Sequence, residues 1–275
     1  MTDDLLGRLE AYYDSVPRRF ARTEECGPFT LFLGEPGGWT YYARPRLGCG
    51  GPFTPDDVTA AVARLGELEL PQSVEWVHET TPVLLDVVRA TGQFELEELP
   101  LLVLDGDLTV TTPPLPDGVT VRVLASDDVE AVAAARAVSG VGFAIEGTAR
   151  GDAGPAERDA ALRPAQQRVL DLLAEGAVRI AVAEHPELGQ LATGRTLPLA
   201  GVTEVMGVAT LPSARRQGLG AAVTAALVDD ARELGLDTVF LTASSPDVAR
   251  IYAGIGFRPL GTGWVAEVRS FVAVT

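Results

Sequence analysis

The second half of the chain carries the clearer pattern of apolar and polar positions. Residues 119–124 alternate in the manner of a half-buried strand, and Ser126 stands where a helix N-cap is expected. From Gly218 the apolar positions recur at helical spacing, and Gly235 follows the last of them, as is typical of a helix that ends in a left-handed turn. The pattern therefore predicts strands that alternate with helices.

The same criteria predict the other elements of this half. A glycine-rich stretch at 140–154 precedes a second helix, which we expect at 155–175. The remaining elements are strands at 178–184, 190–198, 203–211 and 238–242, a short helix at 247–254 and a closing β-ribbon at 257–274.

The first half shows a weaker but ordered pattern. Its predicted elements are strands at 29–33, 39–42, 74–77 and 101–104, and helices at 54–68 and 82–91. The segment 74–104 parallels the segment 239–268, because both read as strand, helix, glycine with phenylalanine, and strand. We interpret this likeness as a diverged internal duplication.

A proline-rich connector at residues 105–117 separates the halves. Pro113, Pro114 and Pro116 lack backbone donors and favour an extended conformation. We place the boundary near residue 112, so that the predicted domains are 1–112 and 113–275. The length of 275 residues and the hydrophobic content of 47% are sufficient for such cores.

Net charge excludes several classes of partner. The 38 acidic residues against 22 basic ones leave a formal net charge of -16, without the basic surplus that nucleic acid or an anionic membrane surface requires. The N-terminal sequence lacks the basic and apolar regions of a secretory signal, and no apolar run is long enough to span a bilayer. We therefore expect a cytoplasmic protein with no nucleic-acid or membrane partner.

The residues that bind metals or act as nucleophiles are scarce. The two cysteines, Cys26 and Cys49, lack metal-ligand spacing, and the two histidines, His78 and His185, stand alone. The sequence therefore predicts no metal site. A packed or surface position is the more common role for a histidine such as His78, which follows an aromatic strand.

The most informative segment is 204–220, where a strand runs into a turn and then into a helix. Arg215 and Arg216 stand at the turn, and Gly218 and Gly220 flank the helix start. The first amides of a helix lack intrahelical partners and lie at the positive end of its dipole, so they suit a pyrophosphate that glycine allows to come close. A Walker loop is excluded because the chain contains no Lys, and a dinucleotide fingerprint is excluded by its different glycine spacing.

Two motifs in register resemble one known family. Arg215-x-x-Gly218-x-Gly220 matches the acyl-CoA signature Arg/Gln-x-x-Gly-x-Gly/Ala of the GNAT superfamily of N-acetyltransferases. Downstream, Tyr252 and the Gly-Phe pair at 256–257 match the spacing of that family's second motif. The resemblance covers residues 118–275.

The resemblance implies an α/β (α+β) fold of two GNAT-like domains, each a mixed, mainly antiparallel twisted sheet flanked by helices. It implies a degenerate first domain, an intact second domain, acetyl-CoA as acyl donor, and no metal. The implied cofactor-binding residues are Val208, Ala209 and Thr210, whose backbone would pair with pantetheine, and Arg215, Arg216, Gln217, Gly218, Leu219, Gly220 and Ala221 at the turn. Ser245 stands where the family often has Asn, a residue that this chain lacks.

Acetyl transfer to an amine needs an acceptor for the amine's proton and a donor to the leaving thiolate. By the resemblance, Tyr252 is the candidate general acid. Glu204 lies on the strand before the turn, on the same face as Met206 and Val208, and is the candidate base acting through water. Glu146, in the glycine-rich stretch, is a further candidate.

The leading hypothesis is an acetyl-CoA-dependent N-acetyltransferase that acts on a primary amine of a small molecule or peptide. We expect direct attack in a ternary complex, because no cysteine lies near the motifs to carry an acyl group. The alternative is a non-catalytic acyl-CoA-binding module for regulation or interaction. The sequence leaves the acceptor and the oligomeric state open.

A partial echo of the glycine turn occurs in the first half, at residues 45–50. Pro45 replaces the leading Arg, and residues 51–53 intervene before the helix that Thr54 caps. The phosphate-binding dipole would therefore be displaced from the glycines. We expect cofactor binding in the second domain alone.

Overall fold

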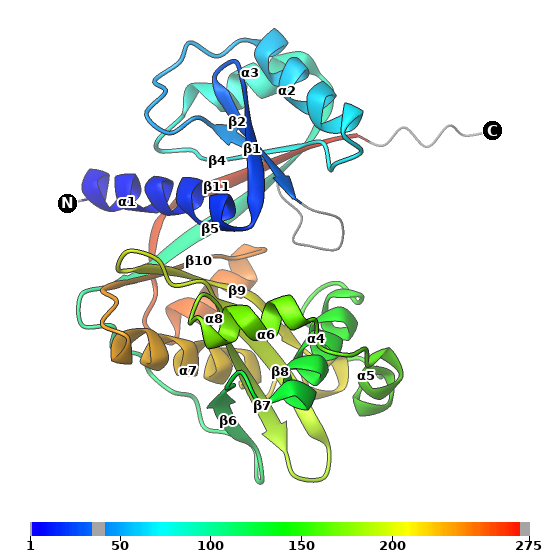
Figure 1. Ribbon diagram of the computed structural model, residues 1–275. Coiled ribbons are helices and arrows are strands. Elements are labelled where there is room, and N and C mark those ends of the chain that lie inside the picture. The colour runs from blue at the N-terminus through cyan, green and yellow to red at the C-terminus, as the bar shows by residue number, and fades with distance from the viewer. Residues whose placement is uncertain (1, 35–41, 270–275) are drawn as a thin grey trace. The chain divides into compact units, whose positions relative to one another are not determined.

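The computed structural model describes residues 2–34 and 42–269, drawn as a ribbon in Figure 1. Its internal contacts divide the chain into two compact units. Unit 1 contains residues 1–101, 243–245 and 260–275, and unit 2 contains residues 102–242 and 246–259. Each unit therefore takes segments from both the early and the late part of the chain.

Unit 1 has the strand order β1-β2-β3-β4-β11-β5. Its elements are α1 (Thr2–Ser15), the 3-10 helix η1 (Pro17–Arg19), β1 (Ala21–Cys26), β2 (Phe29–Gly34), β3 (Ala43–Pro45), α2 (Pro55–Glu67), β4 (Ser73–Val77), α3 (Val83–Thr91), β5 (Phe94–Asp105) and β11 (Arg258–Val268). Trp76 and Trp264 stack in its core with ring centroids 6.3 Å apart. The predicted strand at 39–42 lies, except for Tyr42, outside the described residues.

Unit 2 has the strand order β5-β10-β9-β8-β7-β6, to which β5 contributes its last residues. Its elements are β6 (Thr120–Val123), α4 (Val129–Phe143), α5 (Pro155–Ala161), α6 (Gln167–Ala174), β7 (Arg179–His185), β8 (Gly189–Thr196), β9 (Val202–Thr210), the 3-10 helix η2 (Pro212–Ala214), α7 (Leu219–Glu233), β10 (Thr238–Thr242) and α8 (Pro246–Ala253). The β6–β7, β7–β8 and β8–β9 pairs are antiparallel, and β9–β10 is parallel. The predicted mixed, mainly antiparallel fold flanked by helices is confirmed.

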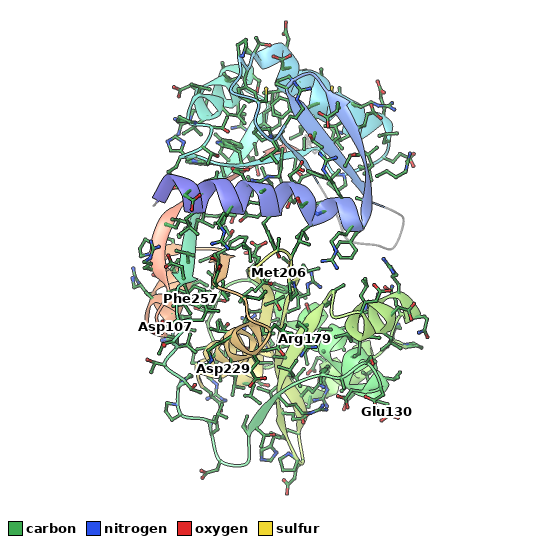
Figure 2. All side chains as sticks on the ribbon, turned by 60° about the vertical axis from the view of Figure 1, so that its left-hand side comes forward. Asp107, Glu130, Arg179, Met206, Asp229 and Phe257 are labelled. Atoms are coloured by element: carbon green, nitrogen blue, oxygen red, sulfur yellow. The ribbon has the colours of Figure 1, made fainter. Side chains whose placement is uncertain are left out.

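Helices α7 and α4 cover opposite faces of the unit 2 strands. A side chain at Gly220 of α7 would point at Val208, whereas a side chain at Gly142 of α4 would point at Ala209. Successive strand residues face opposite sides of a sheet, so the two helices lie on different faces. Arg179 of β7, labelled in Figure 2, ties α7 to the sheet through Asp230, with Nε and Oδ2 2.9 Å apart.

The two halves of the chain exchange their last strands. β11 comes from the second half but pairs in unit 1 with β4, where Trp264 is the register partner of Trp76. The end of β5 comes from the first half but belongs to unit 2. The connector also belongs to unit 2, because Leu108 is fully buried and the Gly106 amide donates to the Asp237 carbonyl at 3.1 Å. The compact units therefore do not follow the expected limits at 112 and 113.

Three predicted elements differ in the structure. The single helix expected at 155–175 is two helices, because Pro164 between them cannot continue a helix. The described part of the predicted closing β-ribbon, 257–269, contains one long strand, β11, and residues 270–274 of that prediction lie outside the described residues. Asp128, not Ser126, is the N-cap of α4, and its carboxylate accepts from the Ala125 amide at 2.9 Å. Among the described helices, none combines the length and the apolar character needed to cross a membrane.

Candidate functional site

Strand β9 contains a bulge beside the predicted cofactor strand. Thr193 of β8 pairs with Ala209, and two residues later Arg195 pairs with Met206, so that Gly207 and Val208 both stand opposite a single residue of β8. Gly207 has a φ of +60°, which glycine adopts at little cost. A bulge leaves backbone groups outside the regular ladder and turns the strand.

The same strand separates from its parallel neighbour. The register between β9 and β10 runs from Val202 opposite Thr238 to Glu204 opposite Phe240, while β9 itself continues to Thr210. Beyond Glu204, the backbone of β9 is therefore no longer paired with β10 within the described residues. An extended ligand can pair with such an edge as an added strand would.

Helix α7 begins without a capping side chain. Gly218 is its N-cap, with a φ of 78° in the left-handed region, and no side chain caps it. The first bond into the helix runs from the Ala222 amide to the Gly218 carbonyl at 2.9 Å, so the amides of Leu219, Gly220 and Ala221 precede it. Its first turn contains no acidic residue. The positive end of the dipole is therefore left for an external anion.

The two glycines of the motif have different surroundings. A Cβ at Gly220 would lie 3.5 Å from Val208 Cγ1 and 3.7 Å from Thr210 Oγ1, so this position sets how closely α7 packs on β9. A Cβ at Gly218 would lie 3.6 Å from Pro113 Cβ and 3.7 Å from the Pro114 carbonyl of the connector. The left-handed backbone is what favours glycine at 218.

The two arginines of the motif point to different places. The side chain of Arg215 is buried and donates hydrogen bonds to the carbonyls of Gly142, Ile145 and Ala149, at 2.7, 2.8 and 3.2 Å. Arg216 is exposed, with a positive φ of 64°. Only Arg216 of this pair thus presents its charge to solvent at the turn.

Tyr252 lies on α8 and its hydroxyl meets α7. Its side chain hydrogen-bonds Thr224, whose own hydroxyl donates to the Gly220 carbonyl at 2.9 Å. Burial raises the pKa of Tyr252 to about 12, although the bond to Thr224 works in the opposite direction. The ring stands edge-on to Phe257, with centroids 6.1 Å apart. The phenol is therefore held protonated, one hydrogen-bonded residue away from the first turn of α7.

The other residues singled out in the sequence lie on several different elements. Glu204 is half-buried on β9, where Thr242 Oγ1 donates to its Oε1 at 3.4 Å. Glu146 is exposed in the loop after α4. Ser245 is half-buried between β10 and α8 and belongs by its contacts to unit 1. His78 also lies in unit 1, outside the two motifs.

Two features of the site were not predicted. The bulge had a signal in the sequence, because an isolated glycine such as Gly207 within a strand pattern often marks one. The contacts of the Arg215 side chain had none, since its acceptors lie 66 to 73 residues earlier in the chain. Met206, the residue before the bulge, is labelled in Figure 2.

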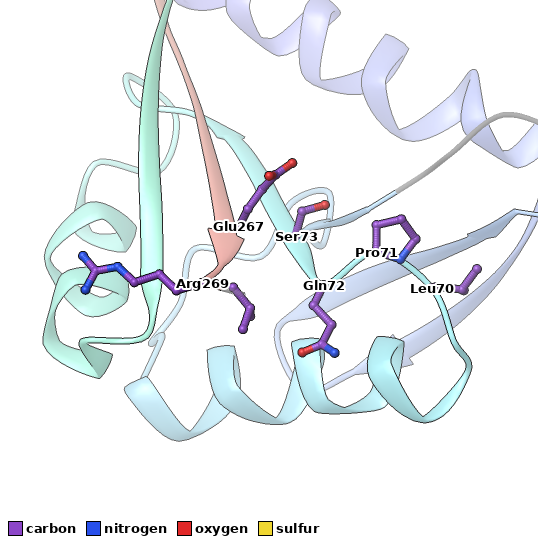
Figure 3. Close-up of a pocket in the computed structure, with 7 residues that line it drawn as sticks. Leu70, Pro71, Gln72, Ser73, Glu267 and Arg269 are labelled. Carbon is purple, nitrogen blue, oxygen red and sulfur yellow. The ribbon is translucent and has the colours of Figure 1, made fainter. Parts of the chain in front are cut away.

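A separate pocket of about 380 Å³ lies in unit 1 and is shown in Figure 3. The residues that line it are Leu70, Pro71, Gln72, Ser73, Glu267, Val268 and Arg269. None of them belongs to the two motifs. Within residues 2–34 and 42–269, no group of three or more His, Cys, Asp or Glu side chains is arranged to hold a metal ion.

Comparison with known proteins points to the same family as the motifs. The model of the acetyltransferase (GNAT) family matches residues 162–257, which include the bulged strand, the start of α7 and Tyr252. No curated protein matches the chain.

Solved structures resemble the chain over nearly its whole length. A GCN5-related N-acetyltransferase from Kribbella flavida is 27% identical, with a TM-score of 0.70 and 96% of both chains covered. A tandem GNAT protein from the clavulanic acid biosynthesis pathway has a TM-score of 0.55 at 14% identity, covering 93% of this chain and 88% of its own. A GCN5-related N-acetyltransferase-like protein from Streptococcus suis has a TM-score of 0.56 at 12% identity, covering 98% of this chain and 100% of its own. Residues 162–257 thus match the acetyltransferase (GNAT) family, and the chain shares the fold of solved GCN5-related N-acetyltransferases over nearly its whole length.

Proposed function

We propose that the chain is an acetyl-CoA-dependent N-acetyltransferase that transfers an acetyl group to a primary amine in a ternary complex. The observation that carries this proposal is the junction of β9 and α7: a bulged strand, separated from β10, leads through one turn to an uncapped helix N-terminus. An extended thioester arm and a pyrophosphate need these two features side by side.

The residues at the junction fit acetyl-CoA. The amides from Arg216 to Ala221, which include those of Gln217 and Leu219, would hold the pyrophosphate, and the backbone of residues 208–210 would pair with the pantetheine arm. The exposed Arg216 would add charge. Ser245 is the proposed substitute for the Asn that the family often carries. When bound, acetyl-CoA supplies an activated acetyl group as a thioester.

Tyr252 and Glu204 are the proposed catalytic residues. A phenol whose pKa is raised to about 12 stays protonated at neutral pH and can donate its proton to the leaving thiolate. Glu204, on the strand that carries the bulge, would accept the amine's proton through water. The free cysteines Cys26 and Cys49 belong to unit 1 and to neither motif, so the proposed transfer is direct and uses no acyl-enzyme.

Release of free thiol from acetyl-CoA tests the activity. Purified full-length protein is supplied with acetyl-CoA and a panel that includes a polyamine, an aminoglycoside and a peptide with a free N-terminus. We expect release above hydrolysis with at least one amine, together with acetylated product by mass spectrometry. Saturable acetyl-CoA binding without release for any amine would instead favour a non-catalytic acyl-CoA-binding module.

We also propose that the second half, expected at 113–275, carries the cofactor site, and that the first half, 1–112, has lost it. The basis is the start of α2, where a capping box involving Thr54 and Asp57 occupies the amides that a phosphate would need. Titration calorimetry with acetyl-CoA should therefore give one site per chain. A second site that disappears on changing Gly48 or Gly50 would contradict this assignment.

A further inference from the structure

The side chain of Arg215 has unusual surroundings for a residue of a phosphate-binding turn. It is 9% exposed, and its two terminal nitrogens donate to three carbonyls of residues 142–149, in the last turn of α4 and the loop after it. A guanidinium is a planar fork with five donors, which allows one side chain to meet several carbonyls in this way. Arg215 therefore connects the motif to a different part of the chain.

Further bonds join the same two segments. The Gly151 amide donates to the Pro212 carbonyl at 3.1 Å, and the Ser213 amide donates to the Ala153 carbonyl at 2.9 Å. Arg150 Nη2 donates to the Ser213 carbonyl at 2.9 Å. The turn from Pro212 to Arg215 is thus bonded along its length to residues 142–153, which we call the α4–α5 segment.

The α4–α5 segment borders the proposed site from the face opposite α7. Its first residue, Gly142, is so close to β9 that a Cβ there would lie 3.0 Å from Ala209 Cβ and 3.3 Å from the Thr210 carbonyl. Ala209 faces away from α7, because it alternates along the strand with Val208, which faces that helix. Phe143 and Ile145 of the segment are exposed, at 60% and 40%. The segment is therefore placed to meet a second reactant that approaches β9 from the side opposite α7.

We propose that Arg215 is a positioning residue that couples acetyl-CoA binding at the turn to the order of the α4–α5 segment. This inference rests on the proposed function, because it requires acetyl-CoA at the turn. Binding at the backbone of residues 216–221 holds the turn in one conformation. Arg215, fixed at the edge of that turn, then holds the carbonyls of Gly142, Ile145 and Ala149 in place, so the acceptor meets an ordered surface only after the cofactor has bound.

Hydrogen exchange measured by mass spectrometry, with and without saturating acetyl-CoA, tests the coupling in the full-length protein. In the wild type, acetyl-CoA should slow exchange in residues 142–153 by about tenfold or more. In Arg215→Ala the segment should exchange rapidly whether or not acetyl-CoA is present, with the acetyl-CoA concentration set by calorimetry so that the variant is saturated as fully as the wild type.

Two variants keep the experiment decisive. Arg215→Lys retains the charge but replaces the fork with a single ammonium, so it should fold and show reduced protection of the segment. Arg163→Ala is the matched control, since Arg163 is an exposed arginine of unit 2 that also donates to backbone carbonyls, those of Ala160 and Leu162. In Arg163→Ala, acetyl-CoA should slow hydrogen exchange of the α4–α5 segment as much as it does in the wild type.

The outcomes separate this inference from the proposed function. Wild-type protection of the segment in both Arg215 variants, or no protection of the segment in a wild type that binds acetyl-CoA, would show that Arg215 does not couple the two segments. No heat of acetyl-CoA binding to the wild type would show that the proposed function itself is wrong, and the coupling would be rejected with it.

Discussion

The two halves of the chain start comparable helices in opposite ways. At α2, Thr54 accepts from the Asp57 amide at 3.2 Å and Asp57 accepts from the Thr54 amide at 2.9 Å, with Asp56 adding a further negative charge in the first turn. At α7, the N-cap is Gly218 and the first turn has no acid. A helix that satisfies and neutralises its own N-terminus is stable but closed to anions, whereas one that leaves it open can bind them.

The glycines before the two helices are nearly identical in conformation. Gly48 has a φ of 76° and Gly218 a φ of 78°, and both are exposed. The two glycines differ in their distance from the helix start, because α7 begins at the residue after Gly218, whereas α2 begins only at Pro55. A left-handed glycine therefore marks a possible phosphate turn only when the helix amides come directly after it.

The two halves also differ in the helix before the second glycine. Four residues before Gly256, α8 carries Tyr252, and four residues before Gly92, α3 carries Val88. Val88 is 1% exposed and packs in the core of unit 1. The first half thus has an apolar side chain where the second half has a proton donor.

The largest effect is expected from separating the halves at residue 112. A fragment of residues 113–275 lacks the end of β5, which supplies buried Leu102, Val103 and Leu104 to unit 2, as well as the buried Leu108. At about 2 kcal/mol for each side chain, the loss approaches the whole stability of a domain, about 5–15 kcal/mol. We expect no cooperative thermal transition by circular dichroism.

Co-expression of residues 1–112 as a second chain is the control and should restore a folded complex. If the fragment 113–275 alone unfolds cooperatively and binds acetyl-CoA, the exchanged strands are not needed for its stability, and the halves are more independent than the compact units indicate.

Gly218→Glu should weaken acetyl-CoA binding by about 1000-fold, because it places a carboxylate at the N-terminus of α7 and removes charged hydrogen bonds of the pyrophosphate. Gly48→Glu is the matched control, with the same backbone strain and charge but open space around a Cβ. Calorimetry should show unchanged affinity for the control. Equal affinity of a folded Gly218→Glu variant and the wild type would remove the turn from the cofactor site.

Tyr252→Phe should lower kcat by about 100-fold with little change in acetyl-CoA affinity, as expected for a general acid that acts in the transition state. Tyr12→Phe, a buried tyrosine of unit 1, is the control and should keep wild-type turnover. Thiol release under saturating substrates measures both. Wild-type turnover in Tyr252→Phe would leave Tyr252 with a packing role, as Val88 has.

The raised pKa of Tyr252 also predicts a pH dependence of stability. Its folded pKa of about 12 exceeds the ordinary value of 10.0, so the fold favours the neutral phenol and this contribution is complete below pH 10. It is lost as the pH rises towards 12. In urea titrations the free energy of unfolding of the wild type should therefore fall more over that pH range than that of Tyr252→Phe. Equal decreases in the two proteins would contradict the raised pKa of Tyr252.

The smallest effect is expected at the start of α2, where the capping box satisfies the first amides. Thr54→Ala removes the cap of α2 and should lower the free energy of unfolding by about 1 kcal/mol, with no change in acetyl-CoA affinity. Thr59→Ala is the same substitution in the interior of α2 and should be neutral or slightly stabilising. A measurable gain of acetyl-CoA binding in Thr54→Ala would show that the capping box alone keeps the first half from binding the cofactor.

Most of the second half could be predicted from its sequence, because the signals there are local. Helix α7, its start at Gly218 and its end before Gly235 agree with glycine conformation and helical spacing. In the first half, the sequence pattern did not predict α1 and β1. The burial of β1 alternates irregularly and none of its residues is fully buried, so the strand lacks the apolar face by which strands are predicted.

Local chemistry in the sequence was sufficient to predict the two motifs and the helix start that suits a phosphate, because turn glycines and apolar periodicity act within a few residues. The mixed fold was predicted from the resemblance that these motifs carry. Only the tertiary structure decided the exchange of the last strands, the bulge register at Gly207 and the direction of the Arg215 side chain. Each of these depends on which distant segment supplies a hydrogen-bond partner or a buried neighbour. A strand such as β11 has the same apolar pattern whether it pairs with β4 or with β10, so packing between segments far apart in the chain makes that choice.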